Sequence, residues 1–363
     1  MHVLHVVGAR PNFMKVAPVY RAIEERGHRQ SIVHTGQHYD SVMSDVFFVE
    51  LGIPAPTVNL EVGPGSHAQQ TAAIMSRFES VVLESSPDLV LVYGDVNSTS
   101  AATLVCAKLG IRVGHVEAGL RSNDRSMPEE INRIVTDQLA DLLFTPSQDG
   151  NENLAREGVP DTKIFFVGNV MIDTLLRSLP QAEEAFRKIS RELGLGEFGL
   201  VTLHRPSNVD DEAAFVPILE VLKEFSRDLP LIFPAHPRTL QKWGARLENC
   251  GPRLKITSPL GYLDFLGLEK NATIVITDSG GVQEETTFLG VPCLTIRANT
   301  ERPVTVTSGT NVLVGDDCQL LRNEFRKNLR GERKAARIPP LWDGHAARRI
   351  AEIICQEQPL TLE

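Results

Sequence analysis

The stretch LVLVYGDVNSTSAATLVCAKLGIRVGHVEAG, residues 89–119, contains one complete strand–helix–strand unit. Its two apolar runs, 89–93 and 112–117, are nearly continuous, which is typical of strands that are buried on both faces of a parallel sheet. The segment 98–109 between them reads as a helix that stops before Gly110. This unit predicts an α/β fold with parallel strands.

The same alternation extends over most of the chain. Helix-like segments are expected at 15–26, 66–84 and 129–140. Further apolar runs that predict strands lie at 2–7, 31–35, 142–145, 164–167, 199–203, 230–234, 254–256, 273–277 and 291–296.

One charged helical segment, 175–199, contains no strand and interrupts this rhythm. We therefore predict two doubly wound, Rossmann-like domains, one over 1–170 and the second over 171–344. The C-terminal helix expected within 345–363 would complete the first domain.

Composition limits the class of protein but says nothing about its chemistry. The 363 residues are 42% hydrophobic and 23% charged, which is ordinary for a soluble globular protein. The net charge of −9 argues against nucleic acid or an anionic membrane as a partner. No apolar run has the length of a membrane helix. The five cysteines are scattered and form no CxxC pair, so we expect no zinc site, no disulfide framework and a cytoplasmic location.

The first predicted strand is followed by a turn with two cations. Gly8 permits a tight turn, and Pro11 suits the start of a helix. Arg10 and Lys15 would then lie near a helix N-terminus, where a phosphate or carboxylate can bind. Two solvated basic residues beside a turn are an equally good interpretation.

A second candidate anion site follows the predicted strand 273–277. Asp278 or Ser279 can cap the next helix, and Gly280 and Gly281 let backbone N–H groups approach an anion. The alternative is an ordinary capped helix. If the two domains face each other across a cleft, the two turns together suit a ligand with a diphosphate.

Acidic side chains also follow predicted strands. Asp95 and Glu117 end neighbouring strands, so one crevice can hold both, and such carboxylates can act as general acid and base. Glu129 and Glu130 follow Pro128 in a first helical turn, where the helix dipole alone explains acidic residues. For that pair a structural role is the favoured interpretation.

Two histidines, His204 and His236, follow strands of the second domain. A histidine at a strand end is more often structural than catalytic. The sequence contains neither a GxSxG nucleophile elbow nor a Walker A motif. The first strand leads into Gly8-Ala9-Arg10 instead of GxGxxG, which weakens a dehydrogenase interpretation.

Ten dispersed segments together resemble the non-hydrolysing UDP-N-acetylglucosamine 2-epimerase family, in the family's order and over nearly the whole chain. They are GARPNFMKVAP (8–18), GQHYD (36–40), YGDVNST (93–99), GHVEAGLRS (114–122), PEEINR (128–133), GNVMID (168–173), LHRPSNVD (203–210), TDSGGVQEE (277–285), ERPVT (301–305) and DGHAARRI (343–350). The family is similar in fold to GT-B glycosyltransferases, with two Rossmann-like domains and a nucleotide-sugar cleft between them.

The resemblance implies interconversion of UDP-GlcNAc and UDP-ManNAc by inversion at C2. In this family UDP is eliminated to give 2-acetamidoglucal, UDP adds back to C1, and a proton returns to the other face of C2. The family uses no nicotinamide cofactor and no metal, and it commonly forms homodimers.

The resemblance also assigns residues. Asp95, Glu117 and Glu129 match the catalytic carboxylates, and His204, Arg10 and Lys15 match residues near the diphosphate and sugar. Ser279, Gly280 and Gly281 would hold phosphate, Glu285 the ribose hydroxyls and Phe265 the uracil, with His236 and Arg302 as further cleft residues. For Phe265 the sequence alone favours core packing.

Two segments depart from the pattern of many bacterial members, Tyr39-Asp40 and Pro206-Ser207. In part of the family these regions hold a second, activating UDP-GlcNAc, so allosteric activation is open here. The departures also leave room for another UDP-sugar, such as a 2,3-diacetamido uronic acid. The remaining alternatives are a hydrolysing 2-epimerase, a GT-B glycosyltransferase and a non-catalytic UDP-sugar-binding protein.

Overall fold

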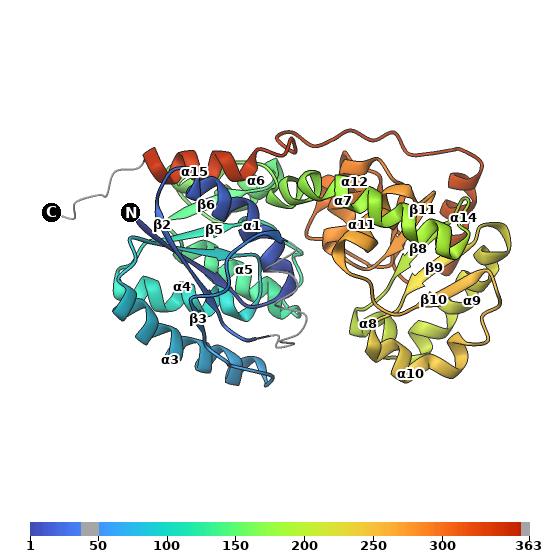
Figure 1. Cartoon of the computed structure of the whole chain (residues 1–363), viewed down its shortest axis with the longest axis horizontal. Helices are drawn as coiled ribbons and strands as arrows, with labels where there is room; N and C mark the ends of the chain where they lie inside the picture. The colour runs from blue at the N-terminus through green and yellow to red at the C-terminus, as the bar shows by residue number, and fades with distance from the viewer. Residues whose placement is uncertain (38–50, 357–363) are drawn as a thin grey trace. The chain divides into compact units, whose positions relative to one another are not determined.

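A computed structural model describes residues 1–37 and 51–356 of the chain. The chain forms two compact units, each built around its own parallel sheet (Figure 1). The first unit contains Met1–Thr174 together with the described residues from Pro340 onward, and the second contains Leu175–Pro339. The predicted α/β class with two Rossmann-like sheets is confirmed.

In the described residues the sheet of the first unit has seven strands in the order β3-β2-β1-β4-β5-β6-β7. Val6 pairs with Val92, and Tyr93 pairs with Val116, so the ends of β1, β4 and β5 lie side by side. The strands are β1 His2–Val7, β2 Arg29–His34, β3 Val58–Asn59, β4 Leu89–Tyr93, β5 Val113–Val116, β6 Leu142–Thr145 and β7 Ile164–Phe166.

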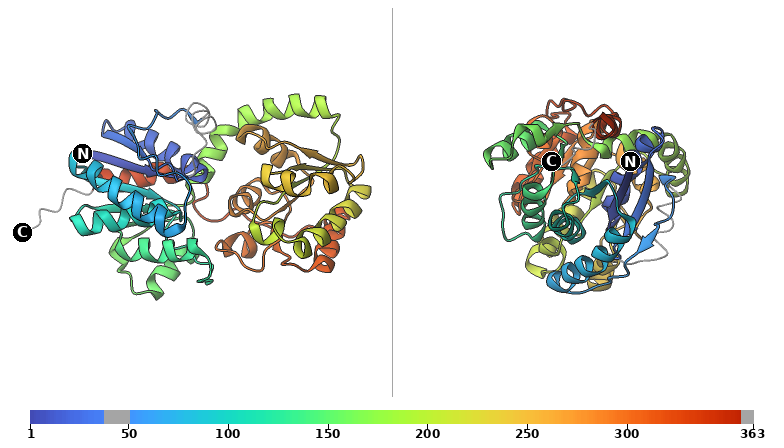
Figure 2. Two further views of the ribbon diagram at one scale, coloured as in Figure 1. Left: turned by 90° about the horizontal axis from the view of Figure 1, so that it is seen from below. Right: turned by 90° about the vertical axis from the view of Figure 1, so that its left-hand side faces the viewer.

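Helices cover this sheet and bury its apolar strands. They are α1 Arg10–Glu24, α3 His67–Ser85, α4 Asn97–Leu109, α5 Pro128–Leu139, α6 Gln148–Arg156, the first turn of α7 Val170–Leu193, the short η1 Asp161–Lys163 and α15 Ala346–Gln356. Figures 1 and 2 show the C-terminal helix α15, in red, beside the blue α1.

Hydrogen bonds from the start of α15 and from Trp342 just before it hold the C-terminal segment to the rest of the first unit. The Asp173 carboxylate accepts hydrogen bonds from the backbone N–H groups of Ala346 and Ala347 at the start of the helix, at 3.3 and 2.9 Å. Burial raises the pKa of Asp173 to about 6. Trp342 donates from Nε1 to the Pro146 carbonyl at 2.9 Å.

The sheet of the second unit has the order β10-β9-β8-β11-β12-β13. Its strands are β8 Gly199–Thr202, β9 Leu231–Pro234, β10 Leu254–Thr257, β11 Ile274–Thr277, β12 Cys293–Thr295 and β13 Asn311–Leu313. Its helices are most of α7, then α8 Pro206–Val209, α9 Glu212–Asp228, α10 Pro237–Leu247, α11 Tyr262–Asn271, α12 Gly280–Leu289, α13 Pro303–Thr307 and α14 Cys318–Leu329. Stacked rings such as Phe215 on Trp243, with centroids 5.0 Å apart, fill its core.

The differences from the sequence predictions have local causes. The edge strands β3 and β13 were not predicted, because two or three residues are too few to show a period. Helix α1 begins at Arg10, five residues before the predicted start. The Asn12 side chain accepts hydrogen bonds from the N–H groups of Gly8 and Ala9, both at 3.0 Å, and so orders the turn into the helix. In the described part of the chain, no helix is long and apolar enough to cross a membrane.

Candidate active site

In the first unit the candidate residues follow three neighbouring strands. Lys15 is on α1 after β1, Asp95 follows β4, and Glu117 follows β5. Because parallel strands end at the same edge of a sheet, these three side chains share that edge.

Lys15 and Glu117 form a buried ion pair beneath the turn at Gly94. Their side chains are 7% and 5% exposed, and Lys15 Nζ contacts Glu117 Oε2. A methyl group at position 94 would lie 2.7 Å from Lys15 Nζ and 3.1 Å from Glu117 Oε2. Gly94 also has a φ of 64°, which favours glycine. Glycine at this position therefore makes room for the ion pair.

The backbone at Glu117 is strained. Its φ is 76°, a left-handed value that is uncommon for a residue with a side chain. The Phe144 carbonyl accepts from the N–H groups of Glu117 and Ala118, at 3.1 and 3.0 Å, and so holds the chain in this conformation. Strain of this kind is concentrated at functional sites, where it sets the direction of one side chain.

Asp95 is the more accessible of the two strand-end carboxylates. Its side chain is 27% exposed and forms an ion pair with the buried Arg133 of α5 at 2.5 Å. Arg133 also donates to Glu130 at 2.7 Å. The Glu130 carboxylate accepts from the backbone N–H groups of Ser122 and Asn123, at 3.0 and 2.8 Å. Glu130 therefore has the structural role that was favoured for it.

Glu129 differs from its neighbour in sequence. It lies exposed in the first turn of α5, whereas Glu130 points into the protein. Its catalytic role remains a prediction from the resemblance alone.

A buried network connects the two turns that carry Asp95 and Glu117. His115 Nδ1 lies 2.6 Å from Asp137 Oδ1, and its Nε2 lies 2.9 Å from the Gly94 carbonyl oxygen. Asp137 also accepts from the Gly119 N–H at 3.1 Å and from Arg121 at 2.7 Å. Burial alone would raise the pKa of Asp137, but His115 and Arg121 beside it lower that pKa below its usual value.

Two sequence predictions concern side chains outside the described structure. Arg10 is the first residue of α1, but its side chain is not among those described. Tyr39 and Asp40 lie outside the described residues altogether. Pro206 and Ser207, the other departure from the family pattern, begin the short helix α8.

In the second unit the candidate residues follow β8, β9 and β11, which are also neighbours. Asp278, after β11, is fully buried and lies 2.7 Å from His204 Nδ1. It also accepts from the Arg205 N–H at 3.0 Å and from Asn208 at 3.0 Å. Burial would raise the pKa of Asp278, but the hydrogen bond and charge of His204 lower it. Asp278 thus orients the His204 loop, and the expectation that it could cap α12 is wrong.

His204 and His236 are both exposed at this edge of the sheet. The His204 side chain is 49% exposed. His236 is the N-cap of α10, where its Nδ1 accepts from the Arg238 N–H at 3.3 Å. Partial burial lowers the pKa of His236, and the charges of His204 and Arg238 lower it further.

The start of α12 presents the Ser-Gly-Gly turn. Ser279 is the N-cap, but its side chain makes no capping hydrogen bond to the described helix, and its own N–H donates to Thr277 Oγ1 at 2.9 Å. A methyl group at Gly280 would lie 3.0 Å from the Arg302 guanidinium carbon, whereas at Gly281 it would meet no described atom within 4 Å. Arg302 thus packs over the first turn of the helix.

Arg302 is held in place by two carboxylates. Its Nε lies 3.0 Å from Glu284 Oε2, and its Nη1 contacts Glu301 Oε1. The Arg302 and Glu301 side chains are 9% and 5% exposed. The predicted cation therefore lies beside the predicted phosphate-binding turn, with its charge already balanced.

Glu285 is buried on α12 and accepts a hydrogen bond from the Tyr262 hydroxyl at 2.8 Å. A second buried carboxyl, Glu269, lies close enough for the charge of Glu285 to act on it. Phe265, predicted from the resemblance to pack on uracil, is half-buried and packs against an apolar cluster that contains Phe198. This position agrees with the core packing that the sequence alone favoured.

Sequence reasoning missed Glu269, Tyr262, His115 and Arg133. Tyr262 and Glu269 are seven residues apart on one helix, with the buried Leu266 between them. That spacing places all three on one face, so a tyrosine and a glutamate in an apolar stripe were a visible signal. His115 lies inside an apolar strand, which is a signal of the same kind.

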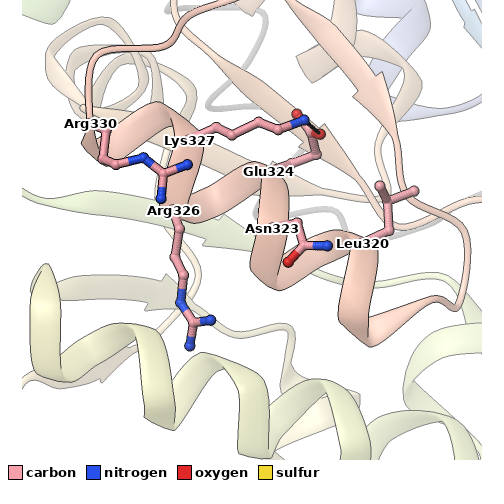
Figure 3. Close-up of a pocket in the computed structure, with 6 residues that line it drawn as sticks. All are labelled: Leu320, Asn323, Glu324, Arg326, Lys327 and Arg330. Atoms are coloured by element: carbon pink, nitrogen blue, oxygen red, sulfur yellow. Dashed lines mark hydrogen bonds and ion pairs between the residues drawn. The ribbon is translucent and has the colours of Figure 1, made fainter.

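A surface hollow of about 320 Å³ lies elsewhere, along α14 (Figure 3). Its cations are paired with acids, Arg326 with Glu224 and Lys327 with Glu324, each at 2.6 Å. No sequence-predicted site residue lines it. Within the described residues, no group of three or more His, Cys, Asp or Glu side chains is arranged to hold a metal ion.

Comparisons with known proteins agree on one family. A family model described as UDP-N-acetylglucosamine 2-epimerase matches residues 21–355. A UDP-N-acetylglucosamine 2-epimerase of Methanocaldococcus jannaschii is 43% identical over 359 residues, 96% of this chain and 97% of the relative. A UDP-2,3-diacetamido-2,3-dideoxy-D-glucuronate 2-epimerase of Pseudomonas aeruginosa is 41% identical over 363 residues, 98% of this chain and all of the relative. The crystal structure of the M. jannaschii UDP-GlcNAc 2-epimerase in complex with UDP-GlcNAc and UDP superposes with a TM-score of 0.92 at 42% identity, covering 98% of this chain and 100% of that one.

Proposed function

The chain belongs to the UDP-N-acetylglucosamine 2-epimerase family, and on that premise we propose that it interconverts UDP-GlcNAc and UDP-ManNAc without releasing free sugar. The observation that carries the proposal is the pair of strand-end carboxylates, Asp95 and Glu117, each ion-paired with a buried cation. Inversion at C2 requires one group that removes a proton and one that returns it to the opposite face.

The proposed reaction has two half-reactions. In the first, a carboxylate removes the C2 proton while the C1–O bond breaks, so that UDP leaves with the electron pair and 2-acetamidoglucal remains. In the second, a UDP oxygen adds to C1 and a carboxylic acid delivers a proton to the other face of C2. We assign both proton transfers to the pair of Asp95 and Glu117, with Glu129 and His204 as the remaining catalytic candidates.

We assign the nucleotide to the residues of the second unit. The first turn of α12 offers backbone N–H groups, which suit a phosphate. His204 is exposed after β8, the strand next to the β11 strand that leads into α12. Glu285 would accept hydrogen bonds from the ribose hydroxyls. Arg302 and His236 would contribute hydrogen bonds to the diphosphate. The resemblance assigns Arg10 and Lys15 to the same group.

One relative supports a second candidate substrate. The P. aeruginosa enzyme, which acts by its name on UDP-2,3-diacetamido-2,3-dideoxy-D-glucuronate, matches this chain over its full length at 41% identity. That sugar carries a carboxylate at C5, so it requires an additional cation in the sugar site. The chemistry at C2 is the same for both sugars.

We also infer a cytoplasmic homodimer. The five cysteines are all free in the structure, which supports a reducing compartment. The dimer is inferred from the family alone. Light scattering after size-exclusion chromatography tests it, because a mass near 80 kDa, about twice the 40.0 kDa of one chain, is expected.

Incubation with UDP-GlcNAc in deuterated water tests the function. We expect NMR to show deuterium at C2 and a fraction of UDP-ManNAc. Free ManNAc would instead indicate a hydrolysing enzyme, and an unlabelled, unchanged substrate would contradict the proposal for this sugar. The diacetamido uronate, incubated in parallel, decides between the two substrates.

A further inference from the structure

Two buried carboxyl groups face each other between α11 and α12. Glu269 is fully buried and Glu285 is 4% exposed. Both carboxyl oxygens of Glu269 are buried without a hydrogen-bond donor from the described residues, and the charge of Glu285 lies close enough to act on them. Glu285 Oε1 accepts from the Tyr262 hydroxyl at 2.8 Å.

Such a pair does not ionise fully. Two carboxylates in contact in a buried site repel strongly, so one of them retains its proton. The titratable groups that act on Glu269 are Glu285 on α12, Tyr262 on its own helix and Cys293 on β12. None of these three carries a positive charge in either protonation state. Burial, followed by the charge of Glu285, raises the pKa of Glu269 well above its usual value.

We propose that Glu269 is a protonated carboxylic acid that positions the Glu285 carboxylate for the ribose hydroxyls of the nucleotide. The proposal rests on the assignment of Glu285 to the ribose under the proposed function. Glu269 and Tyr262 lie two turns apart on one face of α11, so both can donate an O–H hydrogen bond to Glu285. Two donors from one rigid helix fix the direction of the Glu285 carboxylate.

This arrangement makes nucleotide affinity depend on one proton. When Glu269 loses its proton at alkaline pH, Glu285 loses a donor and gains a negative neighbour. The ligand itself is anionic, so the added charge also opposes binding. Glu269 is a positioning residue in this account, because it acts through Glu285 and not on the reacting sugar.

Two variants of the same position test the proposal. Glu269→Gln keeps an uncharged donor at every pH, while Glu269→Met fills similar space without one. We expect calorimetry with UDP to show that wild-type affinity declines toward alkaline pH and that Glu269→Gln removes this decline. Glu269→Met should bind about tenfold more weakly at all pH values, the loss expected for one hydrogen bond to a charged group. Equal affinity of Glu269→Met and wild type, or equal weakness of the two variants, would overturn the proposal.

Infrared spectroscopy tests the proton directly and needs no ligand. The difference spectrum between wild type and Glu269→Gln at neutral pH should contain the carbonyl stretch of a protonated carboxylic acid. The matched control is Glu220→Gln, because the Glu220 side chain is 60% exposed and should give no such band. Absence of the band in the Glu269 difference spectrum would overturn the proposal. If the band is present but wild type binds no UDP, the proposed function fails while the proton assignment stands.

Discussion

Two buried carboxyl groups, one in each unit, lie in opposite surroundings. In the first unit Glu117 lies against the cation of Lys15. In the second unit Glu285 lies against another carboxyl, Glu269, and the phenol of Tyr262. Glu117 thus lies against a cation, while Glu285 lies against an uncharged phenol and a second carboxyl group.

The difference indicates a division of labour. A carboxylate that accepts and returns a proton during a reaction must change its charge, and nearby cations stabilise its charged form. A carboxylate that holds ribose hydroxyls only has to keep its direction, which fixed neutral donors provide.

The largest effect is expected at the strand-end carboxylates of the first unit. Glu117→Gln and Asp95→Asn remove the proton acceptor or donor while keeping the size of the side chain. The rate of deuterium incorporation at C2 should fall by about 10²–10⁴-fold in each variant. Glu220→Gln, on the exposed face of α9, serves as the control. Near-normal deuterium exchange at C2 in both variants would contradict a catalytic role for Asp95 and Glu117.

The next largest effect is expected at Arg133, the buried cation that pairs with Glu130 and Asp95. Arg133→Met leaves the buried Glu130 without its ion-pair partner, so the free energy of unfolding should fall by about 3–5 kcal/mol. Urea denaturation followed by circular dichroism measures this loss. The matched control is Arg326→Met, whose half-exposed ion pair with Glu224 should matter little. Equal stability of the two variants would show that burial of the first pair is unimportant.

A smaller effect is expected for nucleotide binding by the second unit. Glu285→Gln replaces a charged acceptor with a neutral amide, which weakens hydrogen bonds to the ribose. We expect UDP to bind about 10–100-fold more weakly, in keeping with about 1.5–3 kcal/mol for a hydrogen bond to a charged group. Calorimetry with UDP provides the measurement. Unchanged affinity would contradict the assignment of Glu285 to the ribose hydroxyls.

The smallest effect is a dependence of stability on pH. Folded Glu269 holds a proton that the unfolded chain releases above the ordinary pKa of 4.5. Its stabilising contribution is therefore present at acid pH and is lost as the pH rises toward the raised pKa. The unfolding free energy of wild type relative to Glu269→Gln should fall by up to about 1.4 kcal/mol per pH unit. Urea titrations at several pH values give this difference, and a flat profile would contradict a protonated Glu269.

Much of the fold could be predicted from the sequence, because strands buried on both faces leave continuous apolar runs. The run 89–93 gave β4 with its bounds unchanged. The edge strand Val58–Asn59 was missed because it is too short to show a pattern. Asp95 and Glu117 were predicted because each follows a strand, and the sheet order places them after neighbouring strands.

The rest of the site depends on the direction of individual side chains, which the sequence pattern does not determine. Glu129 and Glu130 are adjacent in sequence, yet only Glu130 is buried. Glu269 was not predicted, although it lies in the apolar stripe of α11, because charged residues are rarely buried. Its partner Glu285 comes from another helix, and only the packing of α11 against α12 brings the two together.

The affinity of Glu117→Gln for UDP tests the division of labour most directly. If the first unit carries the proton transfers and the second holds the nucleotide, calorimetry should give the same Kd for this variant as for wild type, although its C2 exchange is lost. Loss of UDP binding together with exchange would contradict the account, because Glu117 would then be a structural residue and not the site of the chemistry.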